Sequence, residues 1–354
     1  MNNYYYNYNQ GYEWPEDREI KRQTLKKRFS RVFVALFVYT LIAQFLSTAL
    51  YIVAAIVMPE EQYQAISGNM LISVAVSCAV QYLVAFPVLF FILRDADKAL
   101  PREQKKMPAK EFIPMLLIAE ILMLAGNWIG TFLNGIIGMF IGQVPENSVS
   151  SIVNEVPIPV IFLLMVIIAP IVEELIFRKL MIDRLAIYGD HMAILFSAVA
   201  FGLIHANLYQ FFYATMLGAL LGYVYTKTGN VKHTILIHMI INFFGSIVPL
   251  VITDVMKSLA LVLESENLIG SGIILQYLPH IMIMIIYLSF QISIIAGGAI
   301  TLWHYVKTRK LMVSRDKEVN ISDVDIIKNG TSNVGAILFL IVSLILSTLS
   351  LFLQ

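Results

Sequence analysis

Charge and cysteine are both scarce in this sequence. Of its 354 residues, 14% are charged and 58% are hydrophobic, and Cys78 is the single cysteine. Soluble domains have about 25% charged and roughly 45–50% apolar residues. The shortage of charge excludes an ordinary soluble domain, and one cysteine excludes an intrachain disulfide and a cysteine-based metal site. We expect no nucleic-acid partner.

Several hydrolase motifs are missing as well. The sequence has no His-Glu-x-x-His motif, which excludes a zincin-type metalloprotease. It also lacks a pair of aspartates within its apolar runs, as well as any Walker or dinucleotide-binding motif. Its one Gly-Ser-Gly, at 270–272, falls in a predicted outer loop, which argues against a rhomboid-like serine site.

The sequence contains many long apolar runs. A membrane-spanning helix needs about 20 mostly apolar residues, and many runs approach this length. They lie near residues 32–58, 69–93, 112–142, 158–178, 191–207, 208–226, 233–252, 279–306 and 334–353. All should be helices, because open strands leave backbone groups unpaired in lipid and no alternating pattern suggests a barrel. The sequence therefore predicts an all-α fold, a polytopic transmembrane helical bundle of about eight or nine spans.

The distribution of Lys and Arg predicts how this bundle is oriented. Seven of them lie in residues 1–31, and six lie in each of the predicted loops 94–111 and 307–333. The longer loops on the other side carry at most one. The short connection that holds Arg184 falls on the basic side. Because basic loops stay in the cytoplasm, we expect a multi-pass protein of the cell membrane with a cytoplasmic N-terminus.

Three charged residues lie close together at the end of the fourth apolar run. They are Glu173, Glu174 and Arg178. A charge near the centre of a membrane helix costs about 2.5–3.5 kcal/mol on insertion scales, so each needs a partner or a function. Glu174 and Arg178 are spaced i, i+4 and can pair on one helix face, which leaves Glu173 without that partner. Taken alone, such a pair is typical of a salt bridge at the membrane edge.

Two histidines and an asparagine follow in the next apolar runs. His205 ends a Phe-x-x-x-His motif, and His238 and Asn242 are again spaced i, i+4. A desolvated carboxylate can act as a general base, while imidazole and amide groups can hold water or stabilise an oxyanion. Glu173, His205 and His238 could instead supply three ligands to zinc or another divalent metal, although Glu173 would then not be a free base. Each residue alone is typical of interhelical hydrogen bonding, and the metal and metal-free alternatives both stay open.

The order of these residues resembles the CPBP family of intramembrane proteases, the group of type II CAAX prenyl endopeptidases and bacteriocin-immunity proteins. The resemblance covers roughly residues 157–250 and rests on the motifs Glu173-Glu174-x-x-x-Arg178, Phe201-x-x-x-His205 and His238-x-x-x-Asn242. It implies an endopeptidase in which Glu173 activates the attacking water. Glu174 and Arg178 would then hold the motif helix in place. The other three polar residues would stabilise the water, a metal ion or the oxyanion: His205, His238 and Asn242.

On this basis the chain divides into four parts. They are a disordered, Tyr/Asn-rich and basic cytoplasmic tail (1–31), N-terminal transmembrane helices (32–156), a catalytic helical core (157–250) and C-terminal transmembrane helices (251–354). The expected partners are membrane lipids and a peptide or protein substrate with a membrane anchor or lipid modification. Two other hypotheses stay open: a small-molecule or ion transporter, and a non-catalytic immunity protein that binds a peptide.

The depth of His205 is difficult to reconcile with that of Glu173. If the fourth span ends near Arg178, Glu173 lies about five residues from the cytoplasmic side. His205 falls about fourteen residues beyond His191, so a straight fifth helix puts it nearer the outer side. At 1.5 Å per residue the mismatch is on the order of 10–15 Å. We expect the 179–192 segment to re-enter the membrane, or the helices to tilt strongly.

Overall fold

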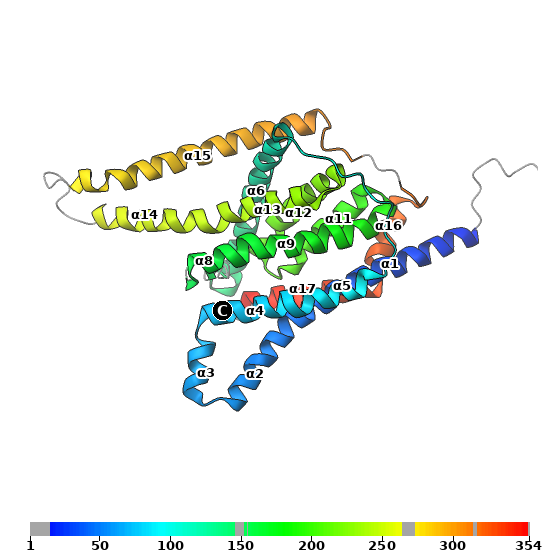
Figure 1. Cartoon of the computed structure of the whole chain (residues 1–354), viewed down its shortest axis with the longest axis horizontal. Helices are drawn as coiled ribbons and strands as arrows, with labels where there is room; N and C mark the ends of the chain where they lie inside the picture. Colours follow the sequence, from blue (N-terminus) through cyan, green and yellow to red (C-terminus); the bar gives the residue numbers. More distant parts are fainter. Residues whose placement is uncertain (1–14, 146–151, 154, 264–272, 314–316, 353–354) are drawn as a thin grey trace, which may run out of the picture.

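The computed structural model describes residues 15–145, 152–153, 155–263, 273–313 and 317–352, and in these residues it is built of helices without a strand (Figure 1). This confirms the predicted all-α fold and the polytopic helical bundle. Residues 1–14, part of the tail predicted to be disordered, lie outside the described residues.

The helices follow one another along the chain, and several contain π-type or 3-10 turns, labelled η. In order they are α1 (Pro15–Leu41), η1 (Ile42–Leu46), α2 (Ser47–Val57), α3 (Glu60–Ser67), α4 (Met70–Ala79), η2 (Val80–Ala85), α5 (Phe86–Arg94), α6 (Ala109–Ile141), α8 (Ile158–Ile161), η3 (Phe162–Ile168), α9 (Ala169–Glu174), η4 (Leu175–Ile182), α10 (Asp183–Leu185), η5 (Ala186–Tyr188), α11 (Asp190–Ile204), α12 (Leu208–Thr228), α13 (Val231–Asn242), η6 (Phe243–Ile247), α14 (Val248–Leu263), α15 (Ile273–Lys307), α16 (Asp323–Thr331) and α17 (Val334–Phe352).

Among the described residues, 7 helical segments are long and apolar enough to cross a membrane by length and composition. They are Asp17–Val57, Met70–Arg94, Ala109–Ile141, Ile158–Tyr188, Val231–Ala260, Tyr277–Lys307 and Val334–Phe352. Each overlaps a predicted span. The two remaining predicted spans, 191–207 and 208–226, form α11 and α12, which pack against each other. At 15 residues α11 is shorter than the usual spanning helix.

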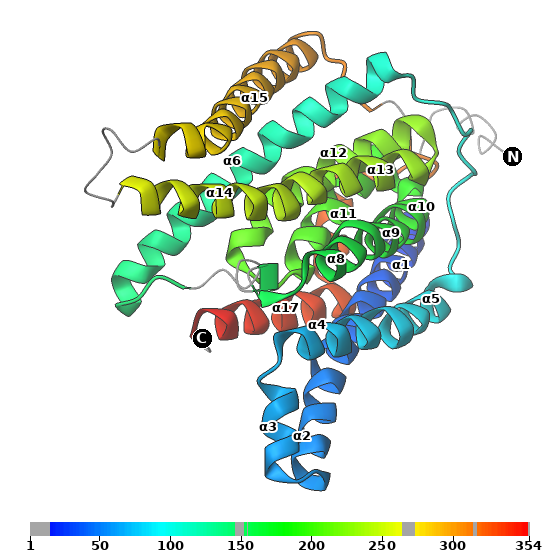
Figure 2. The same ribbon diagram turned by 60° about the vertical axis from the view of Figure 1, so that its left-hand side comes forward.

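The helices before and after the motif region pack onto it. In both views α1, α4, α5 and α17 lie along one side of α8 and α9, with α6, α12 and α13 on the other (Figures 1 and 2). One hydrophobic core cluster includes Leu25, Leu89, Ile176, Phe201 and Phe339, from the first, second, fourth and last long helices and from α11. The N-terminal helices are therefore part of the same core as the motif-bearing helix.

Residues 15–31 were predicted to belong to a disordered tail, and this prediction is wrong. They form the larger part of α1, which continues without interruption into the apolar span. Leu25 and Phe29 are 0% exposed within the core, and Arg22 pairs with Asp325 of α16 at 3.0 Å. The Lys, Arg, Gln and Glu side chains of this segment have high helix propensity, so packing and propensity act together.

Hydrogen bonds link Arg28 of α1, Arg184 of α10 and the backbone carbonyl of Leu93 in α5. We call this group of three residues the arginine layer. Arg184 was predicted to lie in a short connection, but it is fully buried in α10 and donates to the carbonyl of Leu93 in α5 at 3.0 Å. Arg28 of α1 donates to the carbonyl of Arg184 at 3.3 Å. The guanidinium of Arg184 donates to backbone carbonyls, so this charged residue can lie buried within a helix and does not indicate a loop.

The mismatch in depth between Glu173 and His205 disappears because the fourth helix does not end at Arg178. It continues as one helical segment to Tyr188, and the chain reverses at Gly189, whose φ of 99° suits glycine. Glu173 lies 15 residues before Tyr188, and His205 lies 15 residues after Asp190. The two residues therefore reach the same depth on neighbouring helices. We had expected the 179–192 segment to re-enter the membrane separately. It instead continues the fourth helix and makes the turn into α11.

Candidate active site

Glu174 is fixed by several partners. Arg178 donates to it through two nitrogens, Nε to Oε2 at 2.9 Å and Nη2 to Oε1 at 3.1 Å, so the pairing predicted from the i, i+4 spacing is confirmed. Both side chains are 0% exposed. Arg178 also donates to Ser197 of α11 at 3.1 Å, and the Ser197 hydroxyl donates to the carbonyl of Phe177. A bidentate buried pair of this kind holds η4 against α11.

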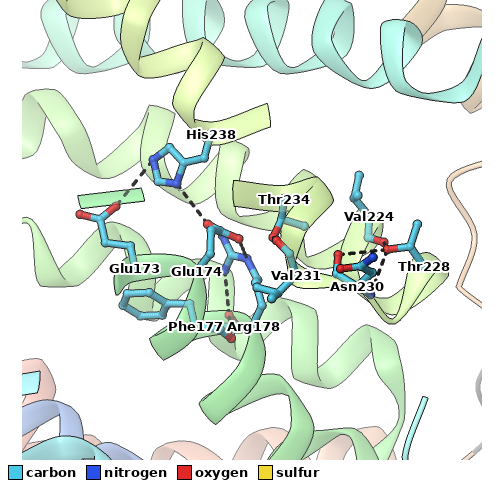
Figure 3. A network of polar contacts seen from close by, with 11 residues as sticks. Glu173, Glu174, Phe177, Arg178, Val224, Thr228, Asn230, Val231, Thr234 and His238 are labelled. Carbon is cyan, nitrogen blue, oxygen red and sulfur yellow. Dashed lines mark hydrogen bonds and ion pairs between the residues drawn. The ribbon is translucent and has the colours of Figure 1, made fainter. Parts of the chain in front are cut away.

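His238 of α13 lies between the two glutamates (Figure 3). Its Nδ1 is 3.1 Å from Oε1 of Glu174, and its Nε2 is 3.6 Å from Oε2 of Glu173. The Glu174 carboxylate is ion-paired with Arg178 and can only accept, so Nδ1 of His238 carries the proton and donates it. In a neutral ring, Nε2 is then an unprotonated acceptor that faces Glu173.

Glu173 differs from its neighbour in exposure. Its side chain keeps 19% of its surface accessible, whereas that of Glu174 keeps none. The 3.6 Å between Glu173 and His238 is longer than a direct hydrogen bond. A single water molecule beside the two groups can bond to both. Glu173 is thus the carboxylate of the pair that a small molecule can reach.

His205 joins this network through an aromatic ring. The ring of Phe201, one turn earlier on α11, lies 5.2 Å from the ring of His205 and 5.7 Å from the ring of His238, in edge-on geometry. The guanidinium of Arg178 lies 5.3 Å from the centre of the same ring. Phe201, which is 1% exposed, therefore lies against the rings of both histidines.

A tight reversal directly after α11 places His205. Ala206 adopts a left-handed conformation with φ of 49°, and Asn207 caps α12 by accepting a hydrogen bond from the N–H of Tyr209 at 2.8 Å. Residues other than glycine rarely adopt positive φ, and such strain is common at functional sites. The turn holds His205 at the end of α11.

Substituting Ala206→Gly should raise the free energy of unfolding by up to about 1 kcal/mol, since glycine adopts positive φ without strain. Ala206→Val should lower it by at least about 1 kcal/mol, because a β-branched side chain fits this conformation poorly. Unfolding in mixed detergent micelles measures both changes. Equal stability of the two variants would contradict the strain at this turn.

Asn242 is held by an irregularity of the neighbouring helix. In η3, a π-type turn, the N–H of Ala169 reaches back five residues to the carbonyl of Leu164. The next residue, Pro170, has no N–H, so the Met165 carbonyl lacks a helical donor. The side-chain amide of Asn242 donates to this carbonyl at 2.8 Å. One amide hydrogen of Asn242 is therefore used to tie α13 to η3.

The structure does not gather a metal-ligand set from the predicted residues. A catalytic zinc site usually has three protein ligands around one open position. Among the residues that the structure describes, no group of three or more His, Cys, Asp or Glu side chains is placed to hold a metal ion. Glu173 and His238 face each other, and the ring of Phe201 lies beside both His238 and His205. A metal therefore stays a hypothesis for experiment.

Three tyrosines near Glu173 were missed by the sequence reasoning. Tyr39 of α1, Tyr82 of η2 and Tyr213 of α12 all lie within reach of the charge of the Glu173 carboxylate. The first two come from spans to which we assigned no function. Tyrosine in membrane helices usually gathers at the water interface, whereas Tyr39 and Tyr82 lie well inside their spans. That unusual position is the signal that could have identified them.

Comparison with known proteins bears on these motif helices. Residues 155–244 match the family model described as Rce1-like, type II CAAX prenyl endopeptidase, and they include α8 to α13 with all three motifs. This part of the chain is similar to the CPBP family of membrane peptidases. A relative from Bacillus subtilis (strain 168), described as "Putative membrane peptidase YdiL", is 28% identical over 189 residues, which are 51% of this chain and 75% of that protein. No solved structure matches the chain.

These similarities support, in general terms, a membrane peptidase of the CAAX-protease type. The family match covers the helices that carry Glu173, His205 and His238, but it leaves α1 to α6 and α14 to α17 outside. The roles of individual residues and the substrate are therefore matters for proposal.

Proposed function

We propose that this protein is an intramembrane endopeptidase in which Glu173 is the general base. The observation that supports this function is that two adjacent carboxylates differ in burial and in their partners. Glu174 is fully buried and bound by Arg178 and His238, whereas Glu173 stays accessible and faces the free nitrogen of His238. One carboxylate orients the histidine, which leaves the other for the reaction.

The reaction begins with a water molecule held between Glu173 and Nε2 of His238, which each accept one of its hydrogens. Glu173 removes a proton as the water oxygen attacks the carbonyl carbon of the peptide bond. His205 lies nearby and donates to the oxygen that becomes negative. The C–N bond of the tetrahedral intermediate then breaks, and the proton on Glu173 passes to the leaving nitrogen.

The surroundings of the site favour peptides that are themselves in the membrane. Glu173 lies inside one of the long apolar helices, and the helices packed around it are apolar as well. A soluble peptide would have to leave water to reach it, which is costly for its backbone. We therefore propose membrane-anchored or lipid-modified peptides as substrates, in the cell membrane and with the N-terminus of the enzyme in the cytoplasm.

Purified protein in lipid nanodiscs tests this function. It is incubated with a library of prenylated, acylated and unmodified peptides of matched sequence, and products are identified by mass spectrometry. We expect cleavage of the lipid-modified peptides only. Equal cleavage of unmodified peptides would contradict the membrane-bound substrate class. A wild type that cleaves nothing but binds a peptide, or that moves a solute, would favour the immunity or transporter hypothesis.

Removing metals distinguishes a metal-dependent reaction from the metal-free one, both of which the sequence left open. Because the side chains alone account for the proposed reaction, treatment with 1,10-phenanthroline and dialysis should change the cleavage rate by less than about twofold. The matched control is the same sample with zinc added back. A large loss that zinc restores would instead assign Glu173 and the histidines to a metal ion.

A further inference from the structure

Three helices meet at the arginine layer and run from it into the bundle. They are α1, the continuous α4–α5 helix and the helix from α9 to α10, which lie beside one another in both views (Figures 1 and 2). On each, one polar residue lies 11 residues inward from the layer: Tyr39 from Arg28, Tyr82 from Leu93, and Glu173 from Arg184. Eleven residues are about three helical turns, or roughly 16 Å. The two phenols therefore reach the depth of the proposed general base.

The two tyrosines belong to the same core as the helix that carries Glu173. Tyr39 is 2% exposed, and it shares one core cluster with Val172, the chain neighbour of Glu173. Tyr82 packs against the same cluster. Both hydroxyl groups lie within reach of the Glu173 charge. The Tyr39 side chain also hydrogen-bonds with Gln81 of η2, and that of Tyr82 hydrogen-bonds with Cys78 of α4, whose thiol is a weak acceptor. Tyr39 and Tyr82 thus form a polar wall in otherwise apolar surroundings.

The residues predicted from the motifs leave few donors for the oxyanion, and the two phenols would add to them. Stabilising the tetrahedral oxyanion takes N–H or O–H groups aimed at the oxygen. His238 offers none, because its Nδ1 donates to Glu174 and its Nε2 is an acceptor. Asn242 uses one amide hydrogen on the Met165 carbonyl. Among the predicted residues only His205 is left with a ring free for this role.

We propose that Tyr39 and Tyr82 donate their phenolic hydrogens to the carbonyl oxygen of the peptide bond under attack. Resting on the proposed function, this assignment gives the N-terminal helices a direct part in the reaction. These helices lie outside the matched residues 155–244, so the active site is completed by a part of the chain that the family match does not cover. The bound peptide lies between α9 on one side and α1 with η2 on the other.

Tyr39→Phe, Tyr82→Phe and the double variant are compared with Tyr51→Phe. Tyr51 is a matched control, because its hydroxyl donates to Ser73 at 3.0 Å and its variant also loses a contact between two N-terminal helices. Turnover is measured with the best substrate from the peptide library. Binding is measured with the phosphinic analogue of that peptide, in which a tetrahedral anion replaces the scissile amide.

Each of the two single variants should lower kcat at least about tenfold, change KM less than about threefold and weaken phosphinic binding by a factor similar to that in kcat. Tyr51→Phe should match the wild type. Wild-type kcat in the double variant would overturn the assignment, and so would parallel losses in KM and phosphinic binding, which indicate disturbed packing. Glu173→Gln in the same assay keeps the two proposals apart: if it still cleaves, the proposed function fails first.

Discussion

Glu173→Gln is expected to lower the rate of peptide cleavage by about 10²–10⁴-fold, the usual contribution of a general base. The amide has nearly the same shape as the carboxylate but cannot take a proton from water. Glu173 lies outside the bidentate pair of Glu174 and Arg178, so the substitution leaves that pair intact. Single-turnover cleavage in nanodiscs measures the rate, and thermal unfolding shows that the variant is folded.

The matched control for this substitution is Glu120→Gln. Glu120 is a second carboxylate inside an apolar helix, α6, and it takes no part in the network of Glu173, Glu174 and His238. Its substitution should leave cleavage within about twofold of the wild type. An equal loss of cleavage in both variants would mean that any carboxylate within the membrane helices affects the rate, which would contradict a specific role for Glu173.

Arg178→Ala should lower the free energy of unfolding by about 3–5 kcal/mol, because it leaves Glu174 buried without its counter-charge. Glu174 is 0% exposed, so water cannot replace the lost partner. The same substitution removes the donor to Ser197 and the cation above Phe201. Reversible unfolding in mixed micelles measures the change, and cleavage should fall as well because His238 loses its orientation.

Replacing both members of the pair provides the comparison for Arg178→Ala. The double variant Glu174→Leu with Arg178→Met fills the space with apolar groups and leaves no charge unpaired. It should be more stable than Arg178→Ala alone, since apolar replacements of buried pairs are often neutral. It should nevertheless cleave poorly, because His238 has lost its hydrogen-bond acceptor. A double variant as unstable as the single one would contradict the explanation by an unpaired charge.

Local spacing was enough to predict the charged pair and the motif helices. Glu174 and Arg178 pair because i, i+4 residues share a helix face, whatever the rest of the fold does. The same spacing placed His238 and Asn242 on one helix, α13. It could not show that His238 would contact both glutamates, because that depends on how α13 packs against α9.

The end of the fourth span was misjudged because charged residues were taken as a sign of the membrane edge. Arg178 is paired inside the core, and Arg184 is satisfied by backbone carbonyls, so neither ends the helix. Once the helix is extended to Tyr188, the depth of His205 follows from the reversal at Gly189. Pairing partners distant in sequence decided this boundary, and local sequence gave no sign of them.

The contribution of the N-terminal helices was also beyond the sequence patterns. Tyr39 and Tyr82 have no motif around them, and their approach to Glu173 depends on the arginine layer, in which Arg28 and Arg184 meet. That layer joins residues more than 150 positions apart. Asn242 gives a similar case, because its partner carbonyl is free only through the π-type turn before Pro170.

The attack of water activated by Glu173 is tested most directly by one single-turnover experiment in H₂¹⁸O. Enzyme in excess cleaves the best lipid-modified peptide, and mass spectrometry reads the isotope in the new carboxyl group. Direct attack predicts one ¹⁸O in the product of the first turnover and no product from Glu173→Gln. A first-turnover product that carries only ¹⁶O would show that Glu173 attacks the peptide itself, and a Glu173→Gln variant that still cleaves would contradict its role altogether.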